Sequence, residues 1–277
     1  MARESPVARA KEDRAPTGAA GAKSAPSAHV TIRGLTKHFP DAILYDRFDL
    51  DIPRGKLLSI FGPNGCGKST LINMITGLIP TDAGEILFDG KPLRDIKFGY
   101  VFQNYREALF PWMRTLDNIA YPLLLEGKSK AEVDRRMEEL VASFDVKFDL
   151  KRYPYELSGG QQQLVSILRA LVVEPQILFL DEPFSALDYE MTLFMREQLQ
   201  KIFMETGMTT VLVSHDLEEA VYLADQVLLL SRHPARVADF PNVDCPRPRD
   251  DATLSDPDFV HLKAHCLEVF QREVRRA

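Results

Sequence analysis

The sequence has few cysteines, no long apolar run and no basic excess. Its three cysteines among 277 residues are too few for a disulfide framework, and they fit reduced thiols in a cytoplasmic protein. No uninterrupted apolar stretch approaches the roughly 18 residues that a membrane-spanning helix needs, so we expect no membrane span. The net charge is −6 and the basic residues are dispersed, which argues against a general nucleic-acid-binding surface.

The sequence does have the composition of an ordinary soluble globular protein. Apolar residues make up 45% and charged residues 27% of the chain, and its length supports one large domain or two closely joined ones. Residues 1–28 differ, because they mix basic and acidic residues with Ala, Pro, Ser and Gly and contain no apolar h-region. We therefore predict a disordered tail rather than a secretory signal, with order beginning near His29.

Strand patterns dominate the part of the chain before residue 103. They predict half-buried strands at 30–32 and 48–52, an apolar strand at 57–61, a strand at 84–90 that closes in an Asp-Gly turn, and a strand at 98–102. A helix is predicted at 71–75. This part therefore predicts a P-loop core with an added antiparallel layer.

Between about residues 103 and 170 the pattern becomes helical. Ser129 and Glu132 have the spacing of a capping box, and apolar residues follow at helical intervals. Apolar strands then return at 177–180, 209–213 and 227–230. Since helices separate these strands, we expect a mainly parallel sheet.

The last part of the chain divides into two predicted segments. Residues 232–251 are rich in Pro and Asp, which predicts a linker. Residues 255–276 predict a final helix, because apolar side chains recur along one face. These side chains are Phe259, Leu262, Cys266 and Phe270. We expect this helix to dock against the core of the chain.

A glycine-rich loop follows the predicted strand at 57–61. Its residues are Gly62, Pro63, Asn64, Gly65, Cys66, Gly67, Lys68, Ser69 and Thr70. In the P-loop pattern, backbone N–H groups face phosphates, Lys68 neutralises the β and γ oxygens, and the Ser69 hydroxyl ligates Mg²⁺. The alternative, a structural glycine turn, is disfavoured by the strand before the loop and the helix after it.

Two carboxylates follow the apolar strand at 177–180. Asp181 is placed at the end of the strand, where it can hold Mg²⁺ directly or through water, and Glu182 can point at a water that attacks the γ-phosphate. The alternative is a pair of solvated acids at the start of a loop. The P-loop about 115 positions upstream makes that alternative improbable.

A second anion-seeking element lies at residues 157–161. Ser158 is followed by Gly159 and Gly160 at the start of a helical run, so a hydroxyl and bare backbone N–H groups are presented together. Helix N-termini of this kind attract anions. The sequence therefore predicts a nucleotide that is bound from two sides.

Taken together, these motifs resemble the ATP-binding subunit of an ATP-binding cassette (ABC) transporter. The resemblance covers about residues 29–232, and its motifs are the P-loop at 62–70, Gln103 after a strand, LSGGQ at 157–161, FLDEP at 179–183, the segment 185–188, and the segment 214–216. It implies an α/β fold, in which a P-loop NTPase (RecA-like) core carries an antiparallel β-subdomain and an inserted α-helical subdomain at about 103–170. Residues 233–277 are then a linker and a C-terminal helix.

The resemblance implies roles for individual residues in binding ATP and Mg²⁺. The expected catalytic residues are Lys68, Gln103, Glu182 and His215, and the expected Mg²⁺ ligands are Ser69, Gln103 and Asp181. Phe39 stands where the family stacks an aromatic ring on adenine, although a plain core aromatic is the alternative. Gln103 corresponds to the glutamine that senses Mg²⁺ and the γ-phosphate, and His215 to the switch histidine that contacts this phosphate.

The resemblance also implies a head-to-tail homodimer with two ATP molecules at its interface. Ser158 and Gly160, together with Gln161, are expected to bind the γ-phosphate that Lys68 of a second copy holds. Asp188 corresponds to the aspartate that crosses to the partner subunit. One departure is Leu164, which stands where many relatives carry a basic residue, so any surface contact there is in doubt.

The segment at 107–119 resembles the importers of nitrate, sulfonates, taurine and related small molecules. It contains Phe110, Trp112 and Ile119 and, with Tyr121, forms an apolar cluster suited to receive a helix end of a membrane partner. The expected function is ATP hydrolysis that energises import through transmembrane permease subunits, with a solute-binding protein as an indirect partner. The chain is then peripheral, at the cytoplasmic face of the membrane, and binds no nucleic acid.

Three alternatives belong to other functional classes. A non-transport ABC ATPase that acts on nucleic acid or the ribosome usually carries two cassettes, a coiled-coil insertion or a basic surface, and none is visible here. A lipid-handling or exporting transporter is disfavoured by the importer-like segment. A purely regulatory nucleotide-binding module is disfavoured by the intact set of catalytic residues.

Overall fold

The computed structural model describes residue 1 and residues 28–93, 96–144, 146–185 and 187–275. The predicted disordered tail therefore lies almost wholly outside the described residues. Among the described residues, no helix combines the length and the apolar character needed to cross a membrane.

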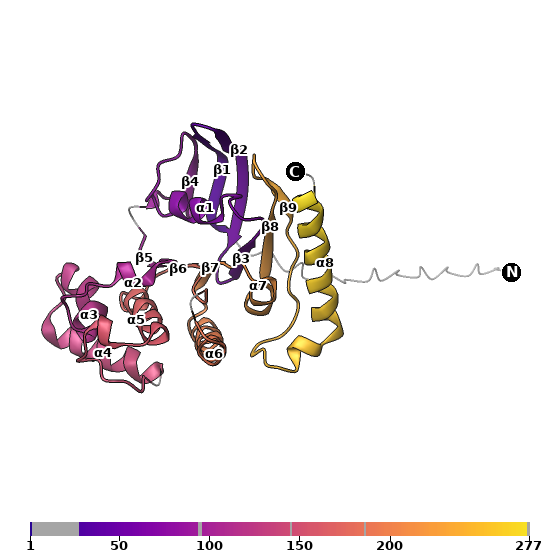
Figure 1. Cartoon of the computed structure of the whole chain (residues 1–277). Coiled ribbons are helices and arrows are strands. Elements are labelled where there is room, and N and C mark those ends of the chain that lie inside the picture. Colours follow the sequence, from indigo (N-terminus) through magenta and orange to yellow (C-terminus); the bar gives the residue numbers. More distant parts are fainter. Residues whose placement is uncertain (2–27, 94–95, 145, 186, 276–277) are drawn as a thin grey trace.

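A sheet of six strands forms the centre of the molecule (Figure 1). Its order is β5 (Phe98–Val101), β6 (Ile177–Asp181), β7 (Thr209–Val213), β3 (Leu57–Phe61), β8 (Gln226–Leu230) and β9 (Val237–Asp239). The neighbours from β5 to β8 are parallel, which confirms the predicted mainly parallel sheet. Every residue of β3, β6 and β7 is buried, as expected for parallel strands that are covered on both faces.

A second, antiparallel sheet covers one side of the core. It consists of β2 (Ala42–Pro53), β1 (Ala28–Phe39) and β4 (Ala83–Phe88), in that order. Asp89 and Gly90 both have positive φ, and Phe88 and Lys91 exchange backbone hydrogen bonds across them. This confirms the predicted Asp-Gly turn, since a type I′ turn requires positive φ at both central positions.

The helical region follows β5 and forms a separate cluster in Figure 1. It contains α2 (Tyr105–Ala108), α3 (Thr115–Leu125), α4 (Lys130–Ser143), the 3-10 turn η2 (Pro154–Glu156) and α5 (Gly159–Leu171). The capping box at Ser129 and Glu132 forms as predicted, with hydrogen bonds in both directions. Leu164 is buried. The position at which the resemblance led us to expect a basic residue is therefore part of the core in this chain.

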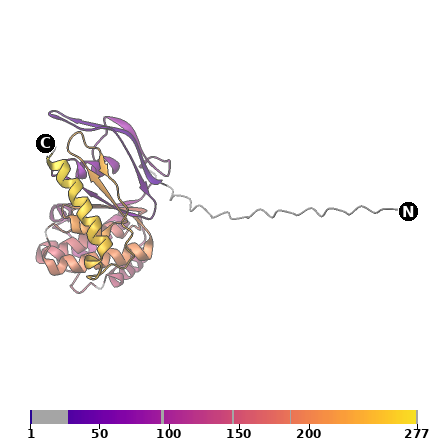
Figure 2. The same ribbon diagram turned by 90° about the vertical axis from the view of Figure 1, so that its right-hand side faces the viewer.

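The remaining helices flank the sheet. They are α1 (Lys68–Ile75), α6 (Tyr189–Thr206), α7 (Leu217–Leu223), the 3-10 turn η3 (Thr253–Ser255) and α8 (Pro257–Arg275). Helix α8 lies along the β8–β9 edge in both ribbon views (Figures 1 and 2). Phe259 and Cys266 are fully buried, and the Phe270 ring lies 5.1 Å from the Phe61 ring. The predicted docking of this helix on the core is therefore confirmed.

The prediction of a linker at 232–251 was wrong in part. Residues 237–239 form β9, which pairs antiparallel with β8, and Arg249 is buried. A strand of three residues is too short to show an alternating pattern, and the Pro and Asp content of its surroundings is typical of a loop. The pairing of β9 arises from the neighbouring edge strand, which is a non-local contact.

Candidate functional site

The glycine-rich loop lies between β3 and α1 and frames a cavity of about 540 Å³. Its lining residues are Asn64, Gly65, Gly67, Lys68, Ser69, Thr70, Gln103, Glu182, Ser185 and His215. Gly65 and Gly67 have φ of 76° and 107°, so the loop uses a conformation that glycine adopts without strain. A side chain at Gly67 would also contact Tyr45 at 3.0 Å.

Lys68 folds back over the loop that precedes it. Its Nζ donates hydrogen bonds to the carbonyl oxygens of Gly62 at 2.9 Å and Pro63 at 3.2 Å, and the side chain is buried. When anionic oxygens enter the loop, the ammonium group can exchange these two carbonyl acceptors for them, because a charged donor bonds phosphate more strongly than a neutral carbonyl. The lysine is thus held inside the cavity in advance of any ligand.

Two predicted loop residues support the cavity from behind. A Cβ added at Gly62 would lie 2.8 Å from the Leu230 carbonyl oxygen, so this glycine permits close packing of the loop on β8. Cys66 is fully buried, and burial raises the pKa of its thiol. Its side chain therefore belongs to the core, while its backbone belongs to the loop.

Asp181, the last residue of β6, faces the start of α1. The Ser69 hydroxyl donates a hydrogen bond of 2.9 Å to its Oδ1. Burial raises the pKa of Asp181, and the hydrogen bond from Ser69 opposes that shift. The Tyr100 hydroxyl, whose own pKa is raised by burial and by Asp181, donates to Asn73 Oδ1 at 2.8 Å.

Glu182, Gln103 and His215 meet at one carboxylate oxygen. Gln103 Nε2 donates to Glu182 Oε2 at 2.9 Å, and His215 Nδ1 lies 3.3 Å from the same oxygen. The three residues follow β5, β6 and β7, which are adjacent parallel strands. Because the carboxyl ends of parallel strands share one edge of a sheet, residues that are far apart in sequence converge there.

The backbone at Glu182 is strained. Its φ is 47°, in the left-handed region that non-glycine residues rarely occupy. The backbone N–H of Glu182 donates to the Val213 carbonyl oxygen at 2.9 Å, and its own carbonyl accepts from the Ser185 hydroxyl at 3.1 Å. Such strain costs on the order of 1–3 kcal/mol and persists only where the surroundings enforce it. Here it directs the carboxylate into the cavity.

The signature segment lies apart from this cavity. Ser158 caps α5, since its hydroxyl accepts from the Gln161 N–H at 3.3 Å while its own N–H donates to Gln161 Oε1 at 3.0 Å. Ser158, Gly160 and Gln161 are absent from the described lining of the cavity. Gly160 packs against α6, where a Cβ would lie 2.4 Å from Met191 Cγ.

The described lining also excludes other predicted binding residues, which are Gly62, Pro63 and Cys66 of the loop, the expected Mg²⁺ ligand Asp181, and Phe39 and Asp188. Phe39 ends β1, is 45% exposed, and has Lys37 Nζ 5.6 Å from its ring centre. Asp188 caps α6 and accepts from the Met191 N–H at 2.8 Å. The structure therefore brings together the P-loop, Gln103, Glu182 and His215, and leaves Phe39, Asp188 and the signature segment at its surface.

Sequence reasoning missed Ser185 as a lining residue. It belongs to the segment 185–188 that the resemblance included, and this was the available signal. Tyr100, which interacts with Asp181, and Asn73, which accepts a hydrogen bond from Tyr100, belong to no motif, and the fold alone brings them together.

The cavity has the donors that a magnesium nucleotide requires. Backbone N–H groups and Lys68 suit phosphate oxygens, while the Ser69 hydroxyl and Asp181 carboxylate are hard oxygen ligands of the kind that Mg²⁺ prefers. Mg²⁺ commonly uses one or two protein oxygens and takes its other ligands from phosphate and water. The donor set therefore fits such an ion.

Comparison with known proteins gives consistent matches. The family model described as "ABC transporter" matches residues 45–185. A sulfate/thiosulfate import ATP-binding protein of Neisseria meningitidis is 42% identical over 211 residues, which are 73% of this chain and 58% of that protein. An aliphatic sulfonates import ATP-binding protein of Bacillus licheniformis is 39% identical, over 84% of this chain and 89% of its own length.

A third relative and a solved structure extend these matches. A spermidine/putrescine import ATP-binding protein of Marinobacter nauticus is 41% identical over 73% of this chain and 55% of its own length. The chain thus spans somewhat more than half the length of several relatives. The dimeric structure of a bacterial ABC transporter cassette superposes with a TM-score of 0.69 at 29% identity, covering 78% of this chain and all of that one.

Proposed function

Since the chain belongs to the ABC transporter family, we propose that it binds and hydrolyses ATP to energise import of a small solute through a membrane permease. The observation that carries the proposal is that Lys68, Ser69 and the Gln103–Glu182–His215 cluster line one cavity, with the buried Asp181 bonded to Ser69 at its edge. Each group matches a different requirement of phosphoryl transfer.

We assign binding of the triphosphate to the P-loop. Backbone N–H groups of the loop face the β and γ oxygens, and Lys68 exchanges the carbonyls of Gly62 and Pro63 for these oxygens. Ser69 and Asp181 hold Mg²⁺, with Gln103 as the additional polar group proposed beside it. The bound ion supplies neutralisation of the charge on the phosphate oxygens. Phe39, exposed at the end of β1, supports the proposal that its ring stacks on the base.

Hydrolysis requires a group that orients water in line with the γ-phosphate. We assign this role to Glu182, because the fold fixes its backbone in a strained conformation at the cavity. Its carboxylate accepts a proton from the attacking water as a general base. Gln103 and His215, which contact Glu182 Oε2 from two sides, orient the carboxylate, and His215 also contacts the γ-phosphate.

We further propose that two copies of the chain complete each other's sites. Ser158 and Gly160 open α5 outside the cavity, so they are available to a nucleotide held by a second molecule. Helix N-termini with free N–H groups favour the added negative charge of a γ-phosphate. The dimeric state of a related cassette supports this proposal. Asp188 caps a helix on the same side, where Gly160 contacts Met191.

The permease contact is proposed at the aromatic cluster of Phe110, Trp112 and Tyr121. The Phe110 ring lies 5.5 Å from the Trp112 ring and 5.0 Å from the Tyr121 ring, and Trp112 is 72% exposed. Ile119 was predicted to share this surface, but its side chain is fully buried. The cluster therefore presents aromatic rings, which suit the docking of a helix end.

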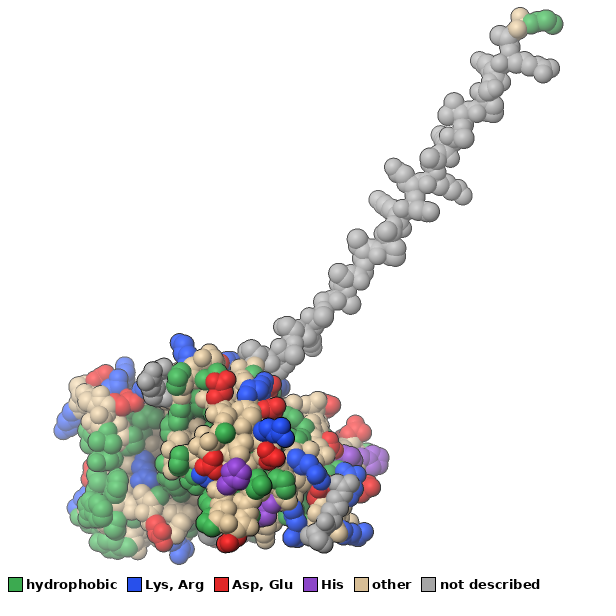
Figure 3. Space-filling model, turned by 90° about the horizontal axis from the view of Figure 1, so that it is seen from above, with side chains coloured by type: hydrophobic (Ala, Val, Ile, Leu, Met, Phe, Trp, Pro, Cys, Tyr) green, Lys and Arg blue, Asp and Glu red, His purple; other side chains and the backbone are tan. Residues whose placement is uncertain are grey.

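The solute is proposed to be a small molecule of the nitrate, sulfonate or taurine type. The names of the relatives support import, and they include importers of sulfate/thiosulfate and aliphatic sulfonates as well as of spermidine/putrescine. The chain then lies at the cytoplasmic face of the membrane, with a solute-binding protein as an indirect partner. On the face shown in Figure 3, Lys and Arg side chains are interspersed with Asp and Glu, so that face gives no basic stripe for nucleic acid.

Phosphate release by the purified chain tests the proposed activity. We expect Mg²⁺-dependent hydrolysis of ATP that EDTA stops and that Lys68→Ala abolishes while the thermal midpoint stays close to that of the wild type. Co-purification with its permease from native membranes tests the transport role. A purified chain that neither binds nor hydrolyses ATP, alone or with the co-purified permease, would overturn the proposal.

A further inference from the structure

His215 stands on a short segment whose geometry is set from behind the cavity. Its side chain is about half exposed, and its contact with Glu182 Oε2 is 3.3 Å long. The preceding Ser214 is buried and accepts a hydrogen bond from the Asp216 N–H at 3.0 Å. The Ser214 hydroxyl also lies 2.8 Å from Glu219 Oε2. Ser214 and Asp216, on the two sides of His215, therefore each form a hydrogen bond with a buried residue.

Glu219 is the buried acid at the centre of these contacts. It lies on the inner face of α7, and burial raises its pKa, while Ser214 and Arg196 favour its charged form. Arg196 projects from α6, with a terminal nitrogen 3.4 Å from Glu219 Oε1 and its guanidinium 5.7 Å from the Tyr222 ring centre. An ion pair buried to this extent fixes the relative position of the two helices, because displacing one partner leaves the other uncompensated.

The other end of α7 is held by residues 243–251, which we call the C-terminal strap. The Arg249 guanidinium is buried and donates to the carbonyl oxygens of Tyr222 and Ala224, both at 2.7 Å, and of Val221 at 3.2 Å. These are carbonyls that the end of a helix leaves without intrahelical partners. The side chain of Arg249 is therefore a cap for α7 that is supplied from outside the helix.

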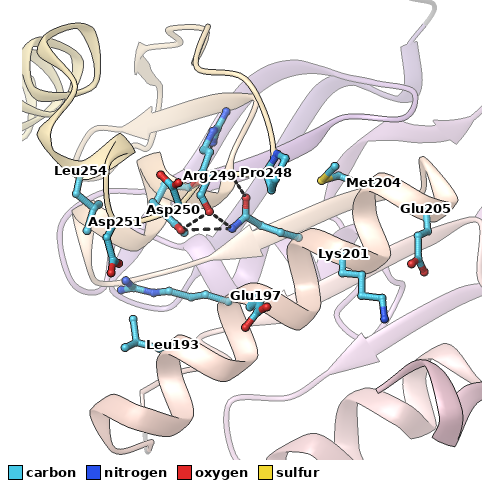
Figure 4. A pocket seen from close by; sticks show the side chains of 13 residues that line it. Leu193, Glu197, Lys201, Met204, Glu205, Pro248, Arg249, Asp250, Asp251 and Leu254 are labelled. Carbon is cyan, nitrogen blue, oxygen red and sulfur yellow. Dashed lines mark hydrogen bonds between the residues drawn. The ribbon is translucent and has the colours of Figure 1, made fainter. Parts of the chain in front are cut away.

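The backbone of the strap is also bonded to the helices. The Arg249 N–H donates to Gln200 Oε1 at 2.8 Å, and its carbonyl accepts from Gln200 Nε2 at 3.0 Å and from the Tyr222 hydroxyl at 2.6 Å. Figure 4 shows these contacts at the wall of a pocket of about 620 Å³ between the strap and α6. Both ends of α7 thus have partners outside the P-loop and outside the cavity.

We propose that Glu219, paired with Arg196, and Arg249 are positioning residues for His215. The helix they hold has seven residues and its N-cap, Asp216, directly follows His215. A helix of this length is not stable by itself and takes its orientation from tertiary contacts. Any displacement of α7 therefore moves His215 relative to Glu182. The kinetic consequence of this inference rests on the proposed ATP hydrolysis. The expected position of the His215 imidazole rests on geometry alone.

The steady-state kinetics of the Glu219→Gln variant test the proposed positioning role of Glu219. The substitution keeps the side-chain volume and removes the charge that faces Arg196. The matched control is Glu197→Gln, at an exposed position next to Arg196 on α6. We expect the turnover number to fall about tenfold with less than about a twofold change in KM for ATP, and the control to match the wild type. In a His215→Ala background the same substitution should have no further effect, because the two residues act as one unit.

Nuclear magnetic resonance of the histidine Cε1–H signals tests the position of the ring without any assay of activity. The signal of His215 is assigned as the one that His215→Gln removes from the spectrum. We expect Glu219→Gln and Arg249→Met to shift it, Tyr222→Phe to shift it less in the same direction, and Arg236→Met, at an exposed arginine, to leave it unchanged. Tyr222→Phe removes one hydroxyl and keeps the ring, so it is informative even where Arg249→Met fails to fold.

The outcomes separate this inference from the proposed function. A wild-type chain that hydrolyses no ATP counts against the proposed function, and the His215 signal still decides the positioning. A hydrolysing wild type whose Glu219→Gln variant has unchanged turnover and an unchanged His215 signal overturns the inference. An equal loss of turnover in the His215 and His215→Ala backgrounds does so as well, because it indicates a purely structural effect.

Discussion

The P-loop face and the signature face differ in how far the chain itself completes them. At the P-loop face, Ser69 already bonds Asp181, and Glu182 already receives Gln103 and His215. At the signature face, Ser158 exchanges hydrogen bonds with Gln161 of its own helix and lies outside the described cavity lining. In our proposal, the first face is a preassembled reaction site, and the second is a helix end that binds a ligand held by another copy of the chain.

The difference follows from what builds each face. The P-loop face collects residues from the carboxyl ends of adjacent parallel strands, so the sheet order itself places them together. The signature face depends on a local capping box, which organises one helix N-terminus and no more. A face built by the sheet can carry out chemistry, whereas a face built by one helix end can recognise charge. The predictions below test this contrast.

Glu182→Gln should give the largest effect, because it removes the proposed base from the preassembled face. We expect turnover to fall about 10²–10³-fold while ATP binding is retained. An ATP-bound dimer that cannot hydrolyse its nucleotide should then accumulate. Phosphate release and light scattering measure the two results. Glu205→Gln, at an exposed position on α6, is the control. Near-normal hydrolysis by the Glu182 variant would remove this residue from the catalytic role.

Ser158→Arg should break the signature face and leave the P-loop face intact. We expect the monomer to bind ATP as the wild type does, while ATP-dependent dimerisation and hydrolysis are lost, because the bulky cation blocks the helix end. Ser129→Arg is the matched control, since it removes the same kind of capping box at a cost of about 1 kcal/mol. A dimer fraction that is the same for both variants would contradict the two-sided site.

The cysteines should report how closely the P-loop is packed. Burial raises the pKa of Cys66 above its ordinary value of 9.0 and that of Cys266 to about 11. A raised pKa leaves less thiolate at a given pH, so alkylation at pH 8 should be slow at both and should accelerate as the pH rises. Cys245 also has a raised pKa but is half-buried, and we expect it to react at least about tenfold faster than Cys66. Mass spectrometry of labelled peptides measures the relative rates of alkylation of the three cysteines. Preferential labelling of Cys66 would contradict the packing described.

Trp112→Ala should have the smallest effect on the isolated chain. The ring is exposed, so we expect a change below about 1 kcal/mol in the free energy of unfolding and unchanged ATP binding, together with loss of co-purifying permease. Ile119→Ala, at the buried neighbour, should instead cost about 2–5 kcal/mol. Denaturant unfolding measures the stability of the two variants, and co-purification measures their binding to the permease. Retention of the permease by a folded Trp112→Ala variant would place its docking surface elsewhere.

Much of the site was predictable, because its parts are local patterns. The glycine loop, the acids after an apolar strand and the Ser158 cap each depend on a few consecutive residues and their own backbone. The sequence also indicated the mainly parallel sheet and the docked helix α8, since both have apolar periodicity. The boundaries at 29–232, 103–170 and 233–277 and the chemical roles of the site residues remain predictions.

The features that were not predictable depend on contacts between distant segments. The features without a local pattern are the pairing of β9 with β8, the burial of Ile119 and the capping of α7 by Arg249. The positive φ of Glu182 is likewise imposed by its surroundings, since an isolated glutamate avoids that conformation. Sequence patterns therefore identified the chemical groups, while tertiary structure determined which of them meet.

Mixing two inactive variants tests most directly whether each site needs both faces and two copies of the chain. Lys68→Ala lacks a working P-loop and Ser158→Arg lacks a working signature, so a mixed dimer contains one complete site. Random pairing makes about half of the dimers mixed, and the mixture should then recover about a quarter of the wild-type rate of phosphate release. A mixture no more active than the sum of its two components would contradict the composite site.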